Sequence, residues 1–506
     1  MAGRSQLALF AFVAALLVLL GGGHLYSPDA VIMFRMSEAL LQGQLAFDPH
    51  GQIGLGGTEA GDGLLYTKYG LGMSLAGLPL VALGQLLDGV SAAAEQGVFH
   101  TPATALGPEN WSGPPAGWKD DRAFRWIWYG TGPASFGTAL SAWLFSWVSA
   151  FATAGCAVVV ARLVELLGMA RRTALLTALA VVLLSPMLHY GREGWSEPLA
   201  TLFTLGILER VLVHRRTGAT GALVVAGALG GGLVLTKVAL VLLALPLCWM
   251  LLDGKRAWGR LLPVALGAAP MLALMGAYNA ARFGSPIATG YGEELALWTT
   301  PWQVGLSGLW VGPSRGLFWF APLLWTAAVG WSALDREGRR LLGAGLAGLV
   351  LLSVFYCRWW AWEGGWCWGP RFLLPALPWV LLAVAPVLDG RVVGWRRGVG
   401  ALGLLAGGVT SWLSIRVNPH DYYQWLKAWA LDNPTHWSAG DWSDLALYDW
   451  QFSPLLTWWR FPVTETNLAA HVVGHHGVVE GTLALALVVA LVAAVWLSRA
   501  LRAGAP

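Results

Sequence analysis

Apolar runs long enough to cross a lipid bilayer recur along the whole chain. A membrane-spanning helix needs about 20 mostly apolar residues, and the first such run, Gln6–Leu25, is followed by roughly eleven more. Of the 506 residues, 56% are hydrophobic and only 12% are charged, with a mean hydropathy of +0.57. These values exclude an ordinary soluble globule and predict an all-α polytopic membrane protein. The first run lacks a small-residue cleavage site, so we expect a retained helix rather than a removed signal peptide.

Motifs of several common protein classes are missing from the sequence. There is no basic tract, no GxxxxGK[ST] and no HExxH, so nucleic-acid partners, nucleotide-driven chemistry and zincin chemistry have no sequence support. Cys156 and Cys248 lie in apolar runs and are expected to be small buried hydrophobes. Cys357 and Cys367 flank one Trp-rich loop and could form a disulfide if that loop faces an oxidising compartment.

Basic residues divide unevenly between alternate turns, which predicts the orientation of the chain. Placing the basic turns in the cytoplasm puts 18 of the 32 Lys and Arg there but only 6 of the 28 Asp and Glu. About twelve spans with both termini cytoplasmic satisfy this pattern. The clearest of these turns contain Arg171-Arg172, His214-Arg215-Arg216, Lys255-Arg256 with Arg260, Arg336, Arg339-Arg340, Arg391, Arg396-Arg397, Arg499 and Arg502, and Arg4 and Arg162 are placed with them.

The orientation also constrains individual segments. The stretch between Arg216 and Asp253 begins and ends in the cytoplasm, so it must be a helical hairpin, with its outer tip near Thr236-Lys237. Gly70–Leu87 is apolar, yet counting it as a span would put Arg171-Arg172 outside. We therefore expect it to lie in or dip into the outer interface.

Three units follow from this topology. Residues 1–415 form a transmembrane module that includes the outer loop 25–135. Residues 416–478 form an outer Trp-rich segment, and residues 479–506 form the last span and a cytoplasmic tail. The chain contains 31 Trp, which suit both an aromatic membrane belt and stacking against sugar rings.

Charged and aromatic residues gather at the predicted outer mouths of the spans. Asp29 follows the first run, where a carboxylate costs less than at mid-bilayer. Cations beside carboxylates on one face suit an anionic amphiphile, because Arg binds phosphate through a bidentate fork. The candidate substrate-binding residues are Lys68, Arg192, Glu193, Glu197, Lys237, Arg315, Glu363, Trp368 and Arg371.

Five stretches of the sequence carry a resemblance to a known family. They are Tyr26–Asp29, Tyr66–Pro79, Tyr190–Leu199, Tyr278–Tyr291 and Trp368–Pro378. In order and sidedness they resemble the membrane-embedded glycosyltransferases of the C-type fold, close to the protein O-mannosyltransferases and the aminoarabinose lipid A transferases. The resemblance implies an aspartate in the first outer loop, juxtamembrane helices after it, and a second acidic loop after the third span.

One departure concerns the second acidic loop. The relatives usually carry Asp there, whereas this chain has Glu193 and Glu197. Either residue could orient the acceptor, with or without a divalent metal as cofactor.

The resemblance and the charged residues together predict an inverting glycosyltransferase at the outer face of a bacterial plasma (inner) membrane. The donor would be a sugar linked to polyprenyl phosphate, and the acceptor a lipid, a glycan or a protein. Asp29 would be the general base, with Lys237, Arg371 and Arg192 stabilising the leaving phosphate. Trp368 and the Trp-rich segment would hold sugar rings.

Two other functions fit parts of the pattern. A flippase or transporter of a lipid-linked sugar would also need cations at span mouths, but should place charges near mid-bilayer, where this chain has almost none. A non-catalytic membrane scaffold would not need site-like residues gathered on one face.

Overall fold

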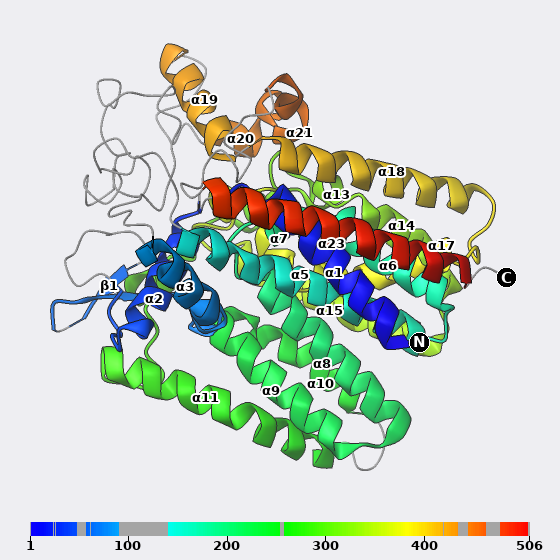
Figure 1. Cartoon of the computed structure of the whole chain (residues 1–506), viewed down its shortest axis with the longest axis horizontal. Coiled ribbons are helices and arrows are strands. Elements are labelled where there is room, and N and C mark those ends of the chain that lie inside the picture. The colour runs from blue at the N-terminus through cyan, green and yellow to red at the C-terminus, as the bar shows by residue number, and fades with distance from the viewer. Residues whose placement is uncertain are drawn as a thin grey trace.

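The computed structural model is a helical bundle with one small strand pair (Figure 1). It describes residues 2–23, 25, 27–47, 57–60, 62–90, 140–252, 258–417, 419–433, 444–461 and 476–503. Tyr26, Trp437, Trp442 and most of the loop 25–135 therefore lie outside the described residues, as does much of the segment 416–478.

The longer helices run side by side along the bundle (Figure 1). They are α1 (Ala2–Leu20), α5 (Leu140–Leu166), α8 (Glu197–Thr217), α9 (Thr220–Thr236), α11 (Leu261–Phe283), α15 (Arg336–Tyr356), α18 (Trp395–Arg416) and α23 (His476–Ala503). The remaining α-helices are α2 (Pro28–Leu41), α3 (Gly72–Val90), α6 (Arg171–Leu183), α7 (Met187–Gly191), α10 (Ala244–Leu251), α12 (Trp302–Val311), α13 (Leu317–Phe320), α14 (Leu323–Gly330), α16 (Leu377–Leu381), α17 (Ala385–Leu388), α19 (Pro419–Asp432), α20 (Asp444–Tyr448) and α21 (Pro454–Thr457). Strands β1 (Gly57–Glu59) and β2 (Leu65–Thr67) pair antiparallel, and the 3₁₀ turns used below are η2 (Val238–Leu243), η4 (Gly292–Ala296) and η6 (Arg371–Leu373).

Six helices among the described residues are long and apolar enough to cross a membrane by themselves. The predicted class, a multi-pass helical membrane protein, is therefore confirmed, whereas the count of twelve spans stays a prediction. The six segments are Gly3–Leu20, Leu140–Leu166, Trp258–Phe283, Arg336–Tyr356, Trp395–Arg416 and Gly477–Arg502. Five shorter apolar helices accompany them, among them Gly72–Leu87, whose interfacial location likewise stays a prediction.

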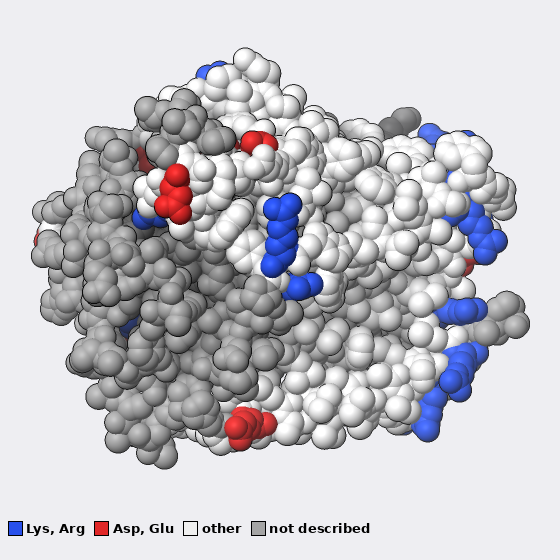
Figure 2. Space-filling view, turned by 90° about the horizontal axis from the view of Figure 1, so that it is seen from above, with Lys and Arg blue, Asp and Glu red and all other residues white. Residues whose placement is uncertain are grey.

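Basic side chains gather at one end of the bundle, where α1 begins and α23 ends (Figures 1 and 2). Contacts between distant turns show that these turns share this end. Arg215 donates to the carbonyl of Met250 at 2.9 Å and lies 3.6 Å from Glu337. Arg340 donates to the carbonyl of Trp249 at 3.0 Å. The grouping predicted from the sequence is present, and its cytoplasmic location stays a prediction.

The helical hairpin predicted between Arg216 and Asp253 is confirmed. Lys237, which follows α9, forms an ion pair with Glu197 at the start of α8. At the other end of α8, Arg215 contacts Met250 near the end of α10. The chain therefore reverses at Lys237, whose extended backbone (φ −153°) separates α9 from η2.

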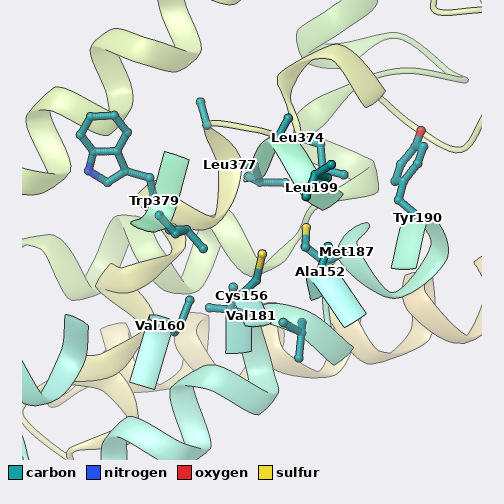
Figure 3. Close-up of a cluster of buried hydrophobic side chains, with 14 of the residues drawn as sticks. Ala152, Cys156, Val160, Val181, Met187, Tyr190, Leu199, Leu374, Leu377 and Trp379 are labelled. Carbon is teal, nitrogen blue, oxygen red and sulfur yellow. The ribbon is translucent and has the colours of Figure 1, made fainter. Parts of the chain in front are cut away.

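Figure 3 shows a cluster of buried hydrophobic side chains between α5, α6, α7, α8 and α16. Cys156 and Trp379 are completely buried in it, so the expectation for Cys156 is confirmed. All four cysteines are free, and the disulfide between Cys357 and Cys367 is not formed. Each of these two thiols instead donates to a nearby backbone carbonyl, Cys357 to Val354 at 3.3 Å and Cys367 to Glu363 at 3.6 Å.

The first outer loop differs from the expectation at its beginning. Helix α1 ends at Leu20 rather than at Leu25, because three consecutive glycines follow and Gly23 adopts φ 74°, a conformation that glycine tolerates without strain. A new helix, α2, then starts at Pro28, with Asp29 in its first turn. Proline at the first helical position and an acidic residue beside it both favour a helix start.

Helices α9 and α11 touch backbone to backbone through glycines. A Cβ atom on Gly227 would lie 2.0 Å from the carbonyl oxygen of Val264, and one on Gly267 would lie 2.0 Å from that of Val224. Small residues allow such close approach between helices in a membrane. Only 11% of the apolar window of α11 is buried, so this contact is the main attachment of α11.

Gly227→Ala should therefore destabilise the protein by about 1–3 kcal/mol, because the added methyl group meets backbone atoms that cannot rotate away. The measurement is thermal unfolding of purified protein in one detergent. Gly221→Ala on the same helix is the matched control, since a Cβ there meets nothing within 4 Å. Equal melting temperatures for the two variants would contradict the proposed packing.

Candidate active site

Asp29 lies in the first turn of α2 and is held by two side chains from distant parts of the chain. The Tyr69 hydroxyl donates to Oδ1 at 2.6 Å, and Nη2 of Arg371 lies 2.5 Å from Oδ2. The Asp29 side chain is 19% exposed. Burial alone would raise the pKa of its carboxyl, but the Arg371 charge and the Tyr69 hydrogen bond more than offset this, and the pKa lies below its ordinary value. Asp29 is therefore ionised at neutral pH.

Arg371 connects Asp29 to a second carboxylate. Its Nε lies 3.5 Å from Oε1 of Glu197, and the same Oε1 forms an ion pair with Lys237. The Arg371 side chain is only 9% exposed and that of Glu197 only 1%. Because a buried charge is tolerated only when it is paired, these contacts fix Asp29, Glu197, Lys237 and Arg371 as one cluster, called the ion cluster below.

The ion cluster keeps unused hydrogen-bonding capacity. Among the described residues, neither Oε2 of Glu197 nor Nε of Arg371 has a hydrogen-bond partner, and both atoms are buried. Buried polar atoms are normally satisfied. A polar ligand entering the cluster would find both an acceptor and a donor available.

Lys68 lies near the ion cluster and adds a further positive charge that acts on Asp29. Its Nζ forms an ion pair with Glu294 of η4 at 2.6 Å and lies 5.7 Å from the ring centroid of Tyr291. It is positioned by its neighbour Thr67, whose carbonyl accepts from Nη1 of Arg282 at 2.5 Å. The C-terminal turn of α11 thus holds the strand that leads to Lys68 and Tyr69.

The two acidic residues of the predicted second acidic loop, Glu193 and Glu197, have different partners in the structure. Glu197 belongs to the ion cluster, whereas Glu193 pairs with Arg192 at 3.1 Å, and Arg192 also donates to the carbonyl of Ile415 at 2.9 Å. Burial raises the pKa of Glu193 to about 8, although the Arg192 charge opposes the shift. The structure does not bring Arg192 and Glu193 to Asp29.

Arg315 holds the turn that packs on Arg371, since a Cβ atom on Gly364 of this turn would lie 3.1 Å from Cγ of Arg371. Arg315 is 1% exposed and donates to the carbonyls of Glu363 at 2.7 Å and Gly365 at 2.5 Å, and to the hydroxyl of Tyr423 at 2.7 Å. Its guanidinium therefore ties the loop after α15 to α19.

Trp368 is fully buried, and its ring contacts other aromatic rings. The ring centroids of Phe320 and Trp458 lie 4.9 and 4.6 Å away. The Trp368 carbonyl accepts from the Tyr190 hydroxyl at 2.7 Å. Trp458 shows that the Trp-rich segment 416–478 contributes to a buried aromatic core, while Trp450 and Trp459 remain exposed.

Aromatic residues that the sequence did not single out surround the ion cluster. The Arg371 guanidinium lies 4.6 Å from the ring centroid of Trp195 and 5.0 Å from that of Phe372. Lys237 lies 5.2 Å from Phe372, which stacks on Tyr356 at 4.2 Å. Such cation–π contacts stabilise partly desolvated cations. The sequence could have pointed to Trp195 and Phe372 only because they lie close in sequence to the candidate residues Glu197 and Arg371.

No group of three or more His, Cys, Asp or Glu side chains that could hold a metal ion is found within the described ranges. The carboxylates of the ion cluster face cations. A divalent metal would therefore have to compete with Arg371 and Lys237.

The structure is similar to two crystal structures of ArnT from Cupriavidus metallidurans, one bound to undecaprenyl phosphate and one in the apo state. Sequence identity is 16% in both cases, and the TM-scores are 0.46 and 0.48. The matches cover 96% and 97% of this chain, and 76% and 77% of the ArnT chains. ArnT is an aminoarabinose lipid A transferase with a GT-C fold, one of the groups that the sequence motifs resemble. No protein-family model and no curated protein matches the chain.

Tyr69→Phe should shift the acid limit of stability to higher pH. The folded pKa of Asp29 is depressed, so its ion contributes stability at neutral pH that is lost as the pH falls through that pKa. Removing the Tyr69 hydroxyl raises this pKa, so the loss begins at a higher pH, and stability at pH 7 falls by about 1.5 kcal/mol. Thermal unfolding measured between pH 3 and pH 7 tests this.

The matched control is Tyr66→Phe. Tyr66 donates to Asp62 at 2.7 Å in the neighbouring hairpin, where the carboxylate is exposed to water. Little change in the pH profile is expected for this variant. A Tyr69→Phe profile that superimposes on the control would exclude the proposed role of the Tyr69 hydroxyl.

Proposed function

We propose that the protein is an inverting glycosyltransferase that moves a sugar from a polyprenyl-phosphate-linked donor to an acceptor hydroxyl. The observation that carries this proposal is the ion cluster: an ionised carboxylate, Asp29, is paired with Arg371, and Arg371 and Lys237 share the carboxylate of Glu197. Acid–base transfer from a lipid phosphate needs these two kinds of group within reach of one sugar. The sequence motifs that resemble C-type glycosyltransferases support the same reaction class.

Asp29 would act as the general base. Its depressed pKa keeps it ionised, and its side chain retains access to solvent. It would take the proton from the acceptor hydroxyl as the acceptor oxygen attacks the anomeric carbon. Tyr69 would fix the carboxylate through Oδ1.

Lys237 and Arg371 would stabilise the negative charge that grows on the leaving phosphate. Both are cations in a largely desolvated site, where such stabilisation is worth more than in water. Lys68 would support the donor from the other side of Tyr69, and Glu197 would hold the two cations in place.

The exposed surface of η2 and α10, the segments that follow Lys237, suits a prenyl chain. Apolar side chains of η2 and α10 are exposed along this stretch, namely Val238, Val241, Leu245 and Trp249. In a bilayer these residues face acyl or prenyl chains, so a lipid could lie along α10 with its phosphate at Lys237.

We place the ion cluster at the outer face of a bacterial inner membrane, because the basic end of the bundle lies opposite to it. The positive-inside rule assigns the basic end to the cytoplasm. Sugars carried by polyprenyl phosphate are presented within the bilayer, which explains why the catalytic residues lie at the mouth of the bundle.

The direct test of the reaction is release of polyprenyl phosphate from a labelled polyprenyl-phosphate sugar by purified protein with a hydroxyl acceptor. A transferase releases the lipid phosphate, whereas a flippase moves the intact donor and releases none. Absence of release with every acceptor class, from a well-folded protein that binds the donor, would exclude the proposal.

Asp29→Asn should lower turnover by about 10²–10⁴-fold, the usual contribution of general-base catalysis. Asn keeps the shape of Asp and one acceptor oxygen but takes up no proton at neutral pH. Turnover per folded molecule is the quantity to measure, with the melting temperature as a check of folding. Glu38→Gln is the matched control, because Glu38 pairs with Arg35 in the same helix and touches no part of the ion cluster. Near-normal turnover by folded Asp29→Asn would remove Asp29 from the mechanism.

The orientation predicts which introduced cysteines react from outside intact cells. Gln42 is exposed after α2 and Thr217 is exposed at the end of α8. Gln42→Cys should react with an impermeant maleimide in intact cells, and Thr217→Cys only after permeabilisation. The reverse pattern would invert the proposed topology. The wild-type protein, with three buried cysteines and the half-buried Cys248, gives the background.

A further inference from the structure

Arg371 contacts the proposed base, Asp29, and also Glu197, the carboxylate that pairs with Lys237. We propose that the Asp29 carboxylate and the phosphate of the released lipid compete for Arg371, so that this guanidinium passes from Asp29 to the phosphate during the reaction. The inference rests on the proposed glycosyl transfer and adds to it a coupling between proton transfer and product binding.

The contacts of Arg371 suit such an exchange. Nη2 is bonded to Asp29 at 2.5 Å, whereas Nε lies 3.5 Å from Glu197 and has no hydrogen-bond partner among the described residues. The rings of Trp195 and Phe372 lie within 4.6 and 5.0 Å of the guanidinium carbon. The aromatic contacts keep the guanidinium in place while its N–H groups change partner.

The charge changes of the reaction occur on the two sides of Arg371. The acceptor oxygen forms a bond to the anomeric carbon, and the bond from that carbon to the phosphate oxygen breaks. The electron pair stays on the phosphate, and the acceptor proton goes to Asp29. The phosphodiester donor carries one negative charge, while the monophosphate product gains a second above its pKa of about 6.

Asp29 loses its negative charge in the step in which the phosphate gains one. The number of negative charges around Arg371 is therefore constant, and the guanidinium needs no water to compensate. Once Asp29 returns its proton to solvent, it again competes for Arg371. The lipid phosphate is then bound less tightly, so release of the lipid product follows release of the proton.

The test is the affinity of purified protein for a polyprenyl monophosphate and for the corresponding uncharged polyprenol. Asp29→Asn imitates the protonated base, so it should bind the monophosphate about tenfold more tightly than the wild type, as expected for one freed charge-assisted contact. Its affinity for the polyprenol should be unchanged. Glu38→Gln removes a carboxylate from α2 without touching Arg371, and its affinities should equal those of the wild type.

A second variant keeps the inference testable if Asp29→Asn folds poorly. Tyr69→Phe removes the hydrogen bond to Oδ1 and so raises the pKa of Asp29; at acidic pH, where more of its Asp29 is protonated than in the wild type, it should bind the monophosphate more tightly than the wild type does. Unchanged or weaker monophosphate binding by the folded variants would overturn the exchange, even if the wild type releases polyprenyl phosphate from its donor. Failure of the wild type to release polyprenyl phosphate would instead overturn the proposed function.

Discussion

The need to pair buried charges organises one whole end of this molecule. Glu197 is almost inaccessible to water, so it requires Lys237 and Arg371, and Arg371 in turn requires Asp29. Breaking a buried pair by removing one partner typically costs about 3–5 kcal/mol. The starts of α2 and α8, the end of α9 and the turn η6 must therefore meet at one point. Ion pairs thus join four segments of the chain whose flanking residues Ala30, Leu199, Leu235 and Leu373 also belong to the apolar core.

The opposite, basic end of the bundle also contains charged residues, but they are arranged differently. There the cations are more exposed, and several bond to backbone carbonyls at helix ends, as Arg215 does to Met250 and Arg340 to Trp249. Exposed pairs contribute little to stability, and under the proposed topology these cations would face the cytoplasm. In the proposal, the charges at one end set the topology, and the charges at the other end form the site.

The sequence identified the four members of the ion cluster because its clearest signals, apolar length and basic turns, place residues at span ends. It could not choose between Glu193 and Glu197, since Glu193 precedes α8 and helical spacing does not apply across the turn. Nor did it show that Arg315 and Trp368 are buried. The sequence pattern of an Arg or Trp beside a span is the same whether the side chain faces a ligand or the protein interior. The α2 start depends on local glycine and proline geometry, which hydropathy does not report.

The glycine contact between α9 and α11 has a mechanical consequence. With backbone against backbone at Gly227 and Gly267, no side chains lie between the helices that could absorb a relative displacement. The two helices are therefore expected to move as one body. Lys237 directly follows α9, and Arg282 lies in the last turn of α11. Little of the rest of the α11 surface is buried by the protein, so few other contacts restrain this helix. A displacement of α11 would therefore be passed to α9 and to Lys237 at its end, and so to the ion cluster.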